Sequence, residues 1–167
     1  MPKQDPIRPT DDEARALARS LINEASFGAI GVIDPETQAP MVTRIAIGTD
    51  TDGCIVALVS DLSAHTRALK VNPVCSLLLG EPGDKGDPLV HPRLTLQCQA
   101  AFLRHGETGH AQLRDHYLIS HPKAKLYVDF ADFAFVRFSV DSALLNGGFG
   151  QAFRLTSSDL SPDATGV

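Results

Sequence analysis

The sequence predicts one mainly β domain, an antiparallel barrel with peripheral helices. About seven or eight segments carry the alternating or β-branched apolar pattern of strands, and most are joined by short turns. Helical apolar spacing occurs in only three places, so strands and helices do not alternate as they do around a parallel sheet. A length of 167 residues suits a single core.

The N-terminal region predicts an arm followed by a helix. Residues 1–9 hold three prolines among polar neighbours, which is typical of an extended arm. In the next segment, 10–26, Thr10 and Glu13 have the spacing of a capping box, and apolar residues then repeat at helical intervals. The main domain is expected over 10–155, with a disordered tail over 156–167.

The next segments predict a hairpin and a strand-to-helix corner. Strands are expected over 27–34, 41–50 and 54–60, and the polar stretch "TDTDG" between the last two predicts an antiparallel hairpin. The stretch "LVSDLSAHTRALKVNP" then passes from a buried strand to an amphipathic helix that starts at Ser63 and stops before Pro73.

The C-terminal half predicts further strands and one helix. A short strand over 75–80 precedes a loop over 81–92 that is too rich in Gly, Pro and Asp for regular structure. A long strand is expected over 93–105, a helix over 107–121 closed by Pro122, and an alternating strand over 130–141. The segment 143–155 predicts two short strands around a glycine turn.

Composition excludes several classes of protein. A net charge of −5 and a pI near 5.6 argue against general binding to nucleic acid or to an anionic membrane. No apolar run approaches the roughly 18 residues that span a bilayer, so a cytoplasmic protein is expected. The three cysteines lie in apolar contexts without CxxC spacing, which predicts reduced, packed thiols.

Familiar catalytic motifs are not found. In "LGEPGDKGDP" a glycine follows the lysine and carboxylates crowd the loop, which does not match a phosphate-binding loop. The histidines do not have the spacing of a zinc site, and the sequence contains no Gly-x-Ser-x-Gly elbow of a serine hydrolase.

The strand-to-helix corner is a candidate anion site. Ser63 is placed to cap the helix, where free N–H groups and the helix dipole stabilise a phosphate, and His65 adds a donor. Arg44 lies within a strand among apolar neighbours, and an arginine there needs solvent or an anionic partner. The alternative is an ordinary helix cap with a solvated arginine. Phe149, in the turn "NGGFG", is either a cover for a flat ligand or an exposed turn residue.

These segments, taken in order, resemble the FMN-binding split-barrel superfamily. Within it, the pyridoxamine 5'-phosphate oxidase-related proteins of the haem-utilisation (HugZ-like) branch are the most similar. The resemblance covers roughly residues 12–155 and depends mainly on "SDLSAHTRAL", "GDPLVHPRLTL" and "HPKAKLYVDF" taken together. It implies a six-stranded antiparallel split barrel that forms a homodimer, with FMN in the cleft between the subunits.

The resemblance also implies a set of cofactor-binding residues. A strand arginine and the strand-to-helix corner hold the FMN phosphate in this family, the long fifth strand contacts the flavin, and the glycine turn of the partner lies near the ring. The corresponding residues here are Arg44, Ser60, Ser63, His65, Thr66, Arg93, Gln97 and Phe149. Because His65 stands where the oxidases have a fixed cation, FMN affinity is expected to weaken as the pH rises through neutrality.

The expected function is that of an FMN-dependent oxidoreductase acting on an unknown small organic substrate. The final strand does not carry the Arg-x-His pair that holds pyridoxamine phosphate in the oxidases, so that substrate is not expected. One alternative is a haem-binding or haem-degrading split barrel, with His91, His105 or His110 as the axial ligand. Another is a non-catalytic flavin carrier or interaction module.

Overall fold

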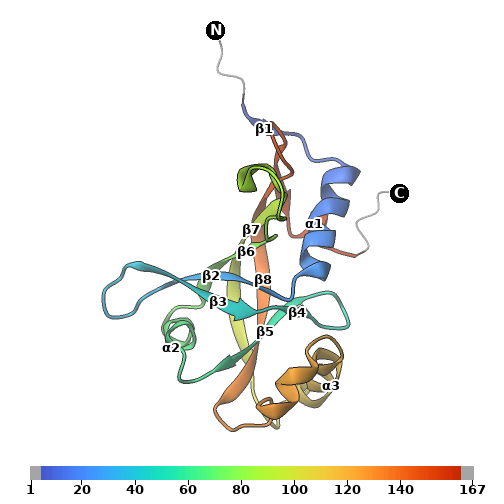
Figure 1. The fold of residues 1–167 in the computed structure, drawn as a ribbon. Helices are drawn as coiled ribbons and strands as arrows, with labels where there is room; N and C mark the ends of the chain where they lie inside the picture. The colour runs from blue at the N-terminus through green and yellow to red at the C-terminus, as the bar shows by residue number, and fades with distance from the viewer. Residues whose placement is uncertain (1–4, 163–167) are drawn as a thin grey trace.

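The computed structural model describes residues 5–162, and Figure 1 shows the arrangement of its elements. In chain order they are β1 (Ile7–Arg8), α1 (Asp12–Glu24), β2 (Phe27–Ile33), β3 (Pro40–Ala46), β4 (Gly48–Thr49), β5 (Ile55–Ser60), α2 (Ala64–Val71), β6 (Val74–Leu79), η1 (Pro88–Val90), β7 (Arg93–Leu103), α3 (His110–Ser120), η2 (Pro122–Leu126), β8 (Phe133–Asn146), β9 (Ala152–Thr156) and η3 (Ser158–Leu160).

The strands form one strongly curved sheet that does not close. Its order is β1-β9-β8-β7-β6-β2-β3, with β5 pairing to β8 and to the short β4. Every ladder is antiparallel except that between β1 and β9. Six strands are six residues or longer, namely β2, β3, β5, β6, β7 and β8. The predicted six-stranded split barrel is therefore confirmed.

Strand β8 joins the two parts of the barrel. It pairs with β7 along one edge, while its other edge pairs first with β5 and then with β9. The sequence predicted two separate strands here, but the run from Phe133 to Asn146 is continuous. The change of partner takes place near a register shift, where Gln97 pairs with Ser142 but Cys98 pairs with Val140; Asp141 is thus an extra residue in β8, which lets the long ribbon bend.

Two apolar cores lie on opposite sides of β5. The main core fills the barrel and includes Ile30, Leu77, Leu96 and Phe138, together with buried residues of α1 and α2. A second core lies between α3 and the outer side of β5 and β8, and its members are Val56, Leu58, Leu103, Leu113, Tyr117, Ala124, Val128 and Phe135. Because β5 contributes to both cores, it is apolar along nearly its whole length.

The first helix forms where the sequence predicts it, but its cap differs. Asp11 precedes the helix and accepts a 2.8 Å hydrogen bond from the Ala14 N–H, so the capping box of Thr10 and Glu13 does not form. The Thr10 hydroxyl instead donates to the Arg154 carbonyl, 2.7 Å away. An aspartate is an equally good cap, and Thr10 is thereby free to fasten the arm to β9.

The predicted hairpin forms only at its turn. Gly48 and Thr49 pair with Val56 and Ile55, but β3 then separates from β5 and pairs along its whole length with β2. The loop over 81–92 also holds a short 3₁₀ turn, Pro88–Val90, which was not expected. The three cysteines are free thiols, as predicted.

The end of the described chain is ordered. The sequence predicted disorder from residue 156, but Ser158–Leu160 form η3, and Asp159 accepts a 2.7 Å hydrogen bond from Arg15 Nε in α1. Thr156 is likewise bonded to Asp159. The predicted tail was wrong as far as residue 162, and residues 163–167 lie outside the described part.

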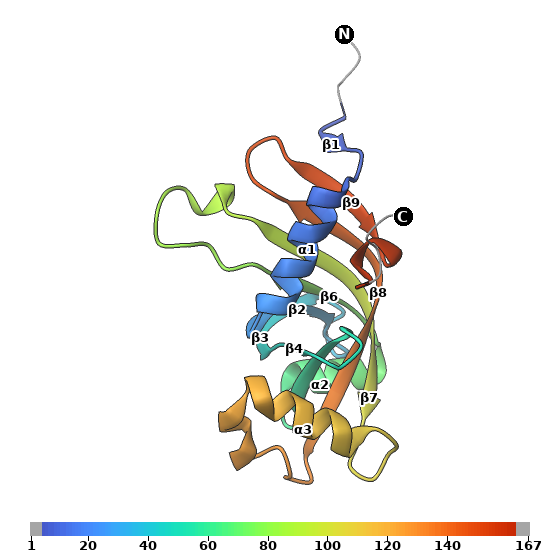
Figure 2. The ribbon, with the colours of Figure 1, turned by 90° about the vertical axis from the view of Figure 1, so that its right-hand side faces the viewer.

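One face of the sheet carries no helix in the part of the chain from 5 to 162. The buried residues of α1 and α2 belong to the main core, and α3 covers only β5 and the start of β8. Figure 2 shows α1 running along the inner side of the sheet and α3 at one end. The opposite side of β3, β2, β6, β7, β9 and the second half of β8 is called the outer face below.

Candidate functional site

The corner between β5 and α2 presents two hydroxyl groups at the start of a helix. Ser63 is the residue before α2, but its side chain makes no capping hydrogen bond. Thr66, in the first turn, is fully buried, and its Oγ1 has no hydrogen-bond partner within residues 5–162. A buried hydroxyl without a partner is costly, but Thr66 Oγ1 is not accessible, so Ser63 is the hydroxyl that a polar ligand could reach at this corner.

His65 differs from the cation expected at this corner. Its Nδ1 lies 2.9 Å from the Thr43 hydroxyl, with which it shares a hydrogen bond. Burial lowers the pKa of His65 below its usual value, so the imidazole is neutral at pH 7. His65 therefore does not supply a fixed positive charge to a phosphate near neutral pH.

The remaining groups of the corner are already paired. The Ser60 hydroxyl donates to Asp132 Oδ2 at 2.9 Å and accepts the Leu62 N–H, which holds the corner against the start of β8. The Asp61 carboxylate lies 2.8 Å from Lys70 Nζ and 3.1 Å from Arg104 Nη2. Hydrogen bonds from these two cations lower the pKa of Asp61. Ser60 is thus a structural member of the corner.

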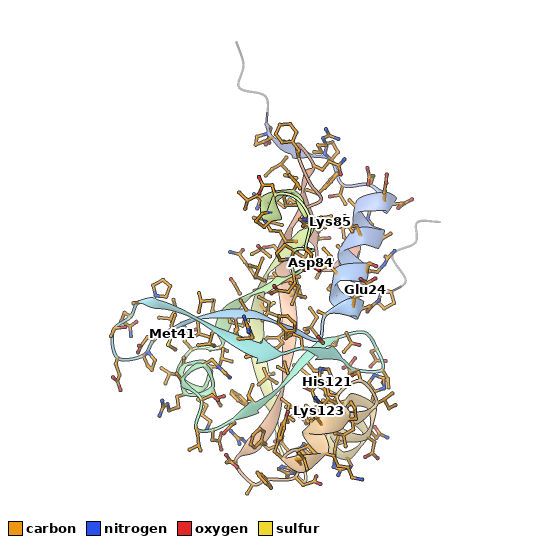
Figure 3. The ribbon with its side chains drawn as sticks, in the orientation of Figure 1. Glu24, Met41, Asp84, Lys85, His121 and Lys123 are labelled. Carbon is orange, nitrogen blue, oxygen red and sulfur yellow. The ribbon has the colours of Figure 1, made fainter. Side chains whose placement is uncertain are left out.

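A cavity of about 240 Å³ opens beside the first turn of α2. It is lined by Asp34, Pro35, Glu36, Met41, Ala64 and Arg67. Figure 3 labels Met41 on the β2–β3 hairpin above α2, and it places Asp84 and Lys85 well away, beyond the opposite end of β6. One cation and two carboxylates line this cavity, so an anion entering it meets attraction and repulsion together.

Arg44 points away from the corner. Side chains alternate along a strand, so Thr43 faces α2 while Arg44 lies on the outer face. There Arg44 is exposed, and its guanidinium carbon lies 5.5 Å from the centre of the Phe27 ring. The structure therefore separates Arg44 from Ser63 and Thr66 within one subunit, contrary to the pairing of β3 with β5 that the sequence suggested.

Arg93 and Gln97 share the outer face with Arg44. Arg93 Nη1 donates to the Leu89 carbonyl at 2.8 Å, and Gln97 accepts a 3.0 Å hydrogen bond from the Ser142 hydroxyl. Phe149, in the turn between β8 and β9, is 96% exposed. The eight predicted residues therefore form two groups, one at the corner and one on the outer face and its upper turn.

One cross-strand row of the outer face has an arginine at each end. The register places its members on six neighbouring strands from β3 to β9, in the order Arg44, Ala29, Leu78, Thr95, Leu144 and Arg154. Leu78 and Leu144 are each 45% exposed, and Phe27 and Val42 are exposed in the two flanking rows. Val74 is exposed one row further away, beyond the row that contains Ser76 and Gln97. The row from Arg44 to Arg154 spans roughly 24 Å along the sheet at the usual strand spacing.

The sequence analysis did not single out this strip or Arg154. The signal was present, because Leu78 and Leu144 occupy the positions where an alternating strand with one wet face carries polar residues. The five large apolar residues Phe27, Val42, Val74, Leu78 and Leu144 and the terminal arginines are called the apolar strip below. Such a surface is typical of an interface or a ligand platform.

Of the three histidines considered as haem ligands, His91 and His105 lie within hydrogen-bond distance of backbone groups and His110 is buried away from the strip. His91 Nδ1 accepts the Gly83 N–H at 3.2 Å, and its Nε2 lies 2.7 Å from the Lys85 carbonyl. His105 Nε2 lies 3.2 Å from the Phe130 carbonyl, and His110 is 5% exposed in the second core. We therefore assign none of the three as a haem ligand. Within residues 5–162 no three His, Cys, Asp or Glu side chains are grouped as a metal site.

No helix of the described chain is long and apolar enough to cross a bilayer.

Comparison with known proteins identifies the family. The family model described as CREG, beta-barrel, matches residues 9–161. The non-canonical heme oxygenase HOZ, chloroplastic, from Arabidopsis thaliana is 32% identical over 136 residues, which are 81% of this chain and 40% of that protein. The chain thus spans well under half the length of this relative.

Solved structures show the same fold. A heme binding protein from Mycobacterium smegmatis superposes with a TM-score of 0.79 at 27% identity, covering 92% of this chain and 61% of that chain. A protein of the pyridoxinephosphate oxidase family from Clostridium acetobutylicum superposes with a TM-score of 0.67 at 16% identity, covering 90% of this chain and 99% of that one. The second likeness concerns the fold alone.

Proposed function

Because this chain belongs to the CREG β-barrel family, in the haem-utilisation branch of the FMN-binding split barrels, we propose that it binds haem. Support comes from the relative named as a heme oxygenase and from the structural neighbour named as a heme binding protein. Oxidative degradation of the bound haem is the activity that the first name suggests. This revises the main expectation from the sequence, which was an FMN-dependent oxidoreductase.

The apolar strip is the observation that carries this proposal. A tetrapyrrole offers a flat apolar surface with both carboxylates on one edge, and the strip offers exposed leucines with an arginine at each end, so that either end could receive the carboxylate edge. Burial of the ring removes apolar area from water, and an arginine binds a carboxylate through a charge-assisted hydrogen bond. The residues proposed to hold haem are Leu78, Leu144, Arg44 and Arg154. When bound, the iron would supply the oxygen chemistry.

We place the haem between two copies of the chain. The strip holds several exposed large apolar side chains on a face without a helix, and a second outer face is the partner that the resemblance implies. In such a homodimer the exposed Phe149 of one subunit would be free to reach across to the other. This arrangement would also bring Arg44 of one subunit towards the strand-to-helix corner of the other, although Arg44 points away from the same corner of its own subunit.

FMN binding is the second candidate, favoured by one different observation. Ser63 offers a hydroxyl without a capping bond at the start of an eight-residue helix, which fits a phosphate, whereas the buried hydroxyl of Thr66 would be reached only if the first turn of α2 moved. The carboxylates beside the cavity and the neutral His65 make this site weaker than the corner of a typical oxidase. On this alternative the protein would be an oxidoreductase or a flavin carrier.

Titration of the purified protein with haemin and, separately, with FMN tests both candidates. The proposal expects a Soret band that saturates at one haemin per subunit or one per dimer, with micromolar or tighter affinity. Incubation of the haem complex with a reductant and oxygen then tests degradation, which would remove the Soret band and release iron. Saturable flavin uptake in the FMN titration, together with no change of the Soret band in the haemin titration, would exclude haem and favour FMN.

A further inference from the structure

A pair of histidines lies where α3 begins, against the second core. His110 is the first residue of α3, and its ring centre lies 4.4 Å from that of His105 and 5.3 Å from that of Phe135 in β8. Only 5% of His110 is exposed, and its Nε2 is buried without a hydrogen-bond partner within residues 5–162. Because α3 packs against β8, the Nε2 atom of His110 is buried, and no hydrogen-bond acceptor of the described chain lies near it for a second proton on the ring.

The charges around His110 come from four segments. Arg114 lies one turn further along α3, and Arg137 of β8 has its Nη2 3.9 Å from where a Cβ of Gly109 would stand. On the acidic side, Glu107 precedes the helix and uses its carboxylate to accept the Arg104 N–H. Asp129, after η2, is bound by Arg114 through hydrogen bonds of 2.6 and 2.7 Å. Both nearby carboxylates are thus already engaged.

The position of His110 at the start of α3 also disfavours its protonated form. The start of a helix carries a partial positive charge, so a protonated imidazole there is unfavourable. Burial is the largest cause that lowers the pKa of His110, and the neighbouring His105 lowers it further. The two contacting rings would repel each other if both were charged.

We propose that His110 is an acid-sensitive latch, whose protonation releases α3 from the second core. While His110 is neutral, its ring packs between His105 and Phe135 and the helix stays closed. When His110 takes up a proton, the helix must open so that the charged ring reaches water. The consequence is a local opening of α3 and η2, with the main core intact.

The sign of the pH dependence follows from the lowered pKa. At pH 7.5 the open and closed forms are both neutral at His110, so the closed form has its full stability. As the pH falls below about 6.5, the open form binds a proton that the closed form rejects. The opening equilibrium then rises by at most about tenfold per pH unit for one group, until the pKa of the closed form is reached.

Hydrogen exchange between pH 7.5 and 5.5, corrected for the intrinsic pH dependence of exchange, tests the latch. Amides of α3 that are protected at pH 7.5 are expected to open roughly three- to tenfold more often per pH unit below 6.5, while amides of α1 do not change. His110→Phe keeps an aromatic ring beside Phe135 and is expected to abolish this response. His116→Gln, on the same helix but half-buried at its outer side, is the matched control and should respond as the wild type does.

Two outcomes would overturn the proposal. The first is equal pH response of α3 in the wild type and in His110→Phe. The second, which needs no variant, is an NMR titration of the wild type in which the His110 ring protonates at or above the pKa of a free histidine. Because α2 contains its own half-buried His65, exchange in α2 is followed separately and does not count for either outcome.

Discussion

His65 Nδ1 lies 2.9 Å from Thr43 Oγ1, and this contact fixes which side of β3 faces the helix α2. The next residue, Arg44, consequently lies on the outer face with Phe27. A one-residue step along β3 thus separates the corner of Ser63 and Thr66 from the apolar strip. The predictions below treat these two regions as independent.

Replacement of Thr43 by valine tests the link between β3 and α2. It leaves a half-buried imidazole nitrogen without its partner, which should lower the free energy of unfolding by about 1 kcal/mol. Thr95→Val, on the outer face, removes a hydroxyl that makes no hydrogen bond within residues 5–162 and should change stability by less than about 0.5 kcal/mol. Urea unfolding at pH 7.5 measures both. Equal stability of the two variants would contradict a structural role for the Thr43–His65 bond.

Arg44→Gln and Arg154→Gln test the haem site. The variant at the end that receives the carboxylate edge of haem is expected to weaken haemin binding by about tenfold, because a charge-assisted hydrogen bond to a carboxylate is lost. Arg67→Gln is the matched control, since Arg67 is also exposed but lies within α2, away from the outer face, and this variant should bind haemin as the wild type does. Spectroscopic titration of all three variants gives the comparison. Wild-type affinity in both strip variants would rule out the strip as the haem platform.

Leu144→Glu tests the interface between subunits. A charge at this position of the strip, next to Arg154, should convert the proposed dimer to a monomer, because a buried unpaired carboxylate costs several kcal/mol per subunit. The fold should tolerate the change, because Leu144 is 45% exposed in the single chain. Leu62→Glu introduces the same charge at a residue that is 79% exposed near the α2 corner and should leave the dimer intact. Sedimentation velocity decides, and a monomeric wild type would refute the interface outright.

Ser63→Ala and Thr66→Val test the FMN alternative. If these hydroxyls bind the phosphate, each change should weaken FMN binding several-fold without altering haemin binding. Thr66→Val should not lower stability, because it removes a buried hydroxyl that has no partner and conserves the side-chain volume. Ser60→Ala should instead lower stability by about 1 kcal/mol, since its hydroxyl bonds to Asp132. Unchanged flavin affinity in both corner variants would leave the corner without a cofactor role.

The sequence was informative wherever short-range patterns decide the structure. Apolar spacing located α1, α2 and α3, and the polar residues after Leu58 marked the strand-to-helix corner correctly. It did not show which face of β3 carries Arg44, because that depends on β3 leaving β5 to pair with β2. Nor did it show that Asp132, from a turn far along the chain, accepts a hydrogen bond from the Ser60 hydroxyl. Charge at His65 was misjudged for a similar reason, since burial by the barrel lowers its pKa.

The two-sided burial of β5 has a consequence for how the chain folds. Strand β5 pairs with β8, through Ser60 with Phe133 and Val56 with Arg137. Because β8 lies more than 70 residues further along the chain, this partner strand is synthesised late in translation. Until β8 has left the ribosome, β5 displays an unpaired edge and two apolar sides. Such non-local pairing slows folding and exposes the nascent chain to aggregation. A chaperone that shields residues 55–60 during synthesis would therefore raise the yield of folded protein more than one acting on any other strand.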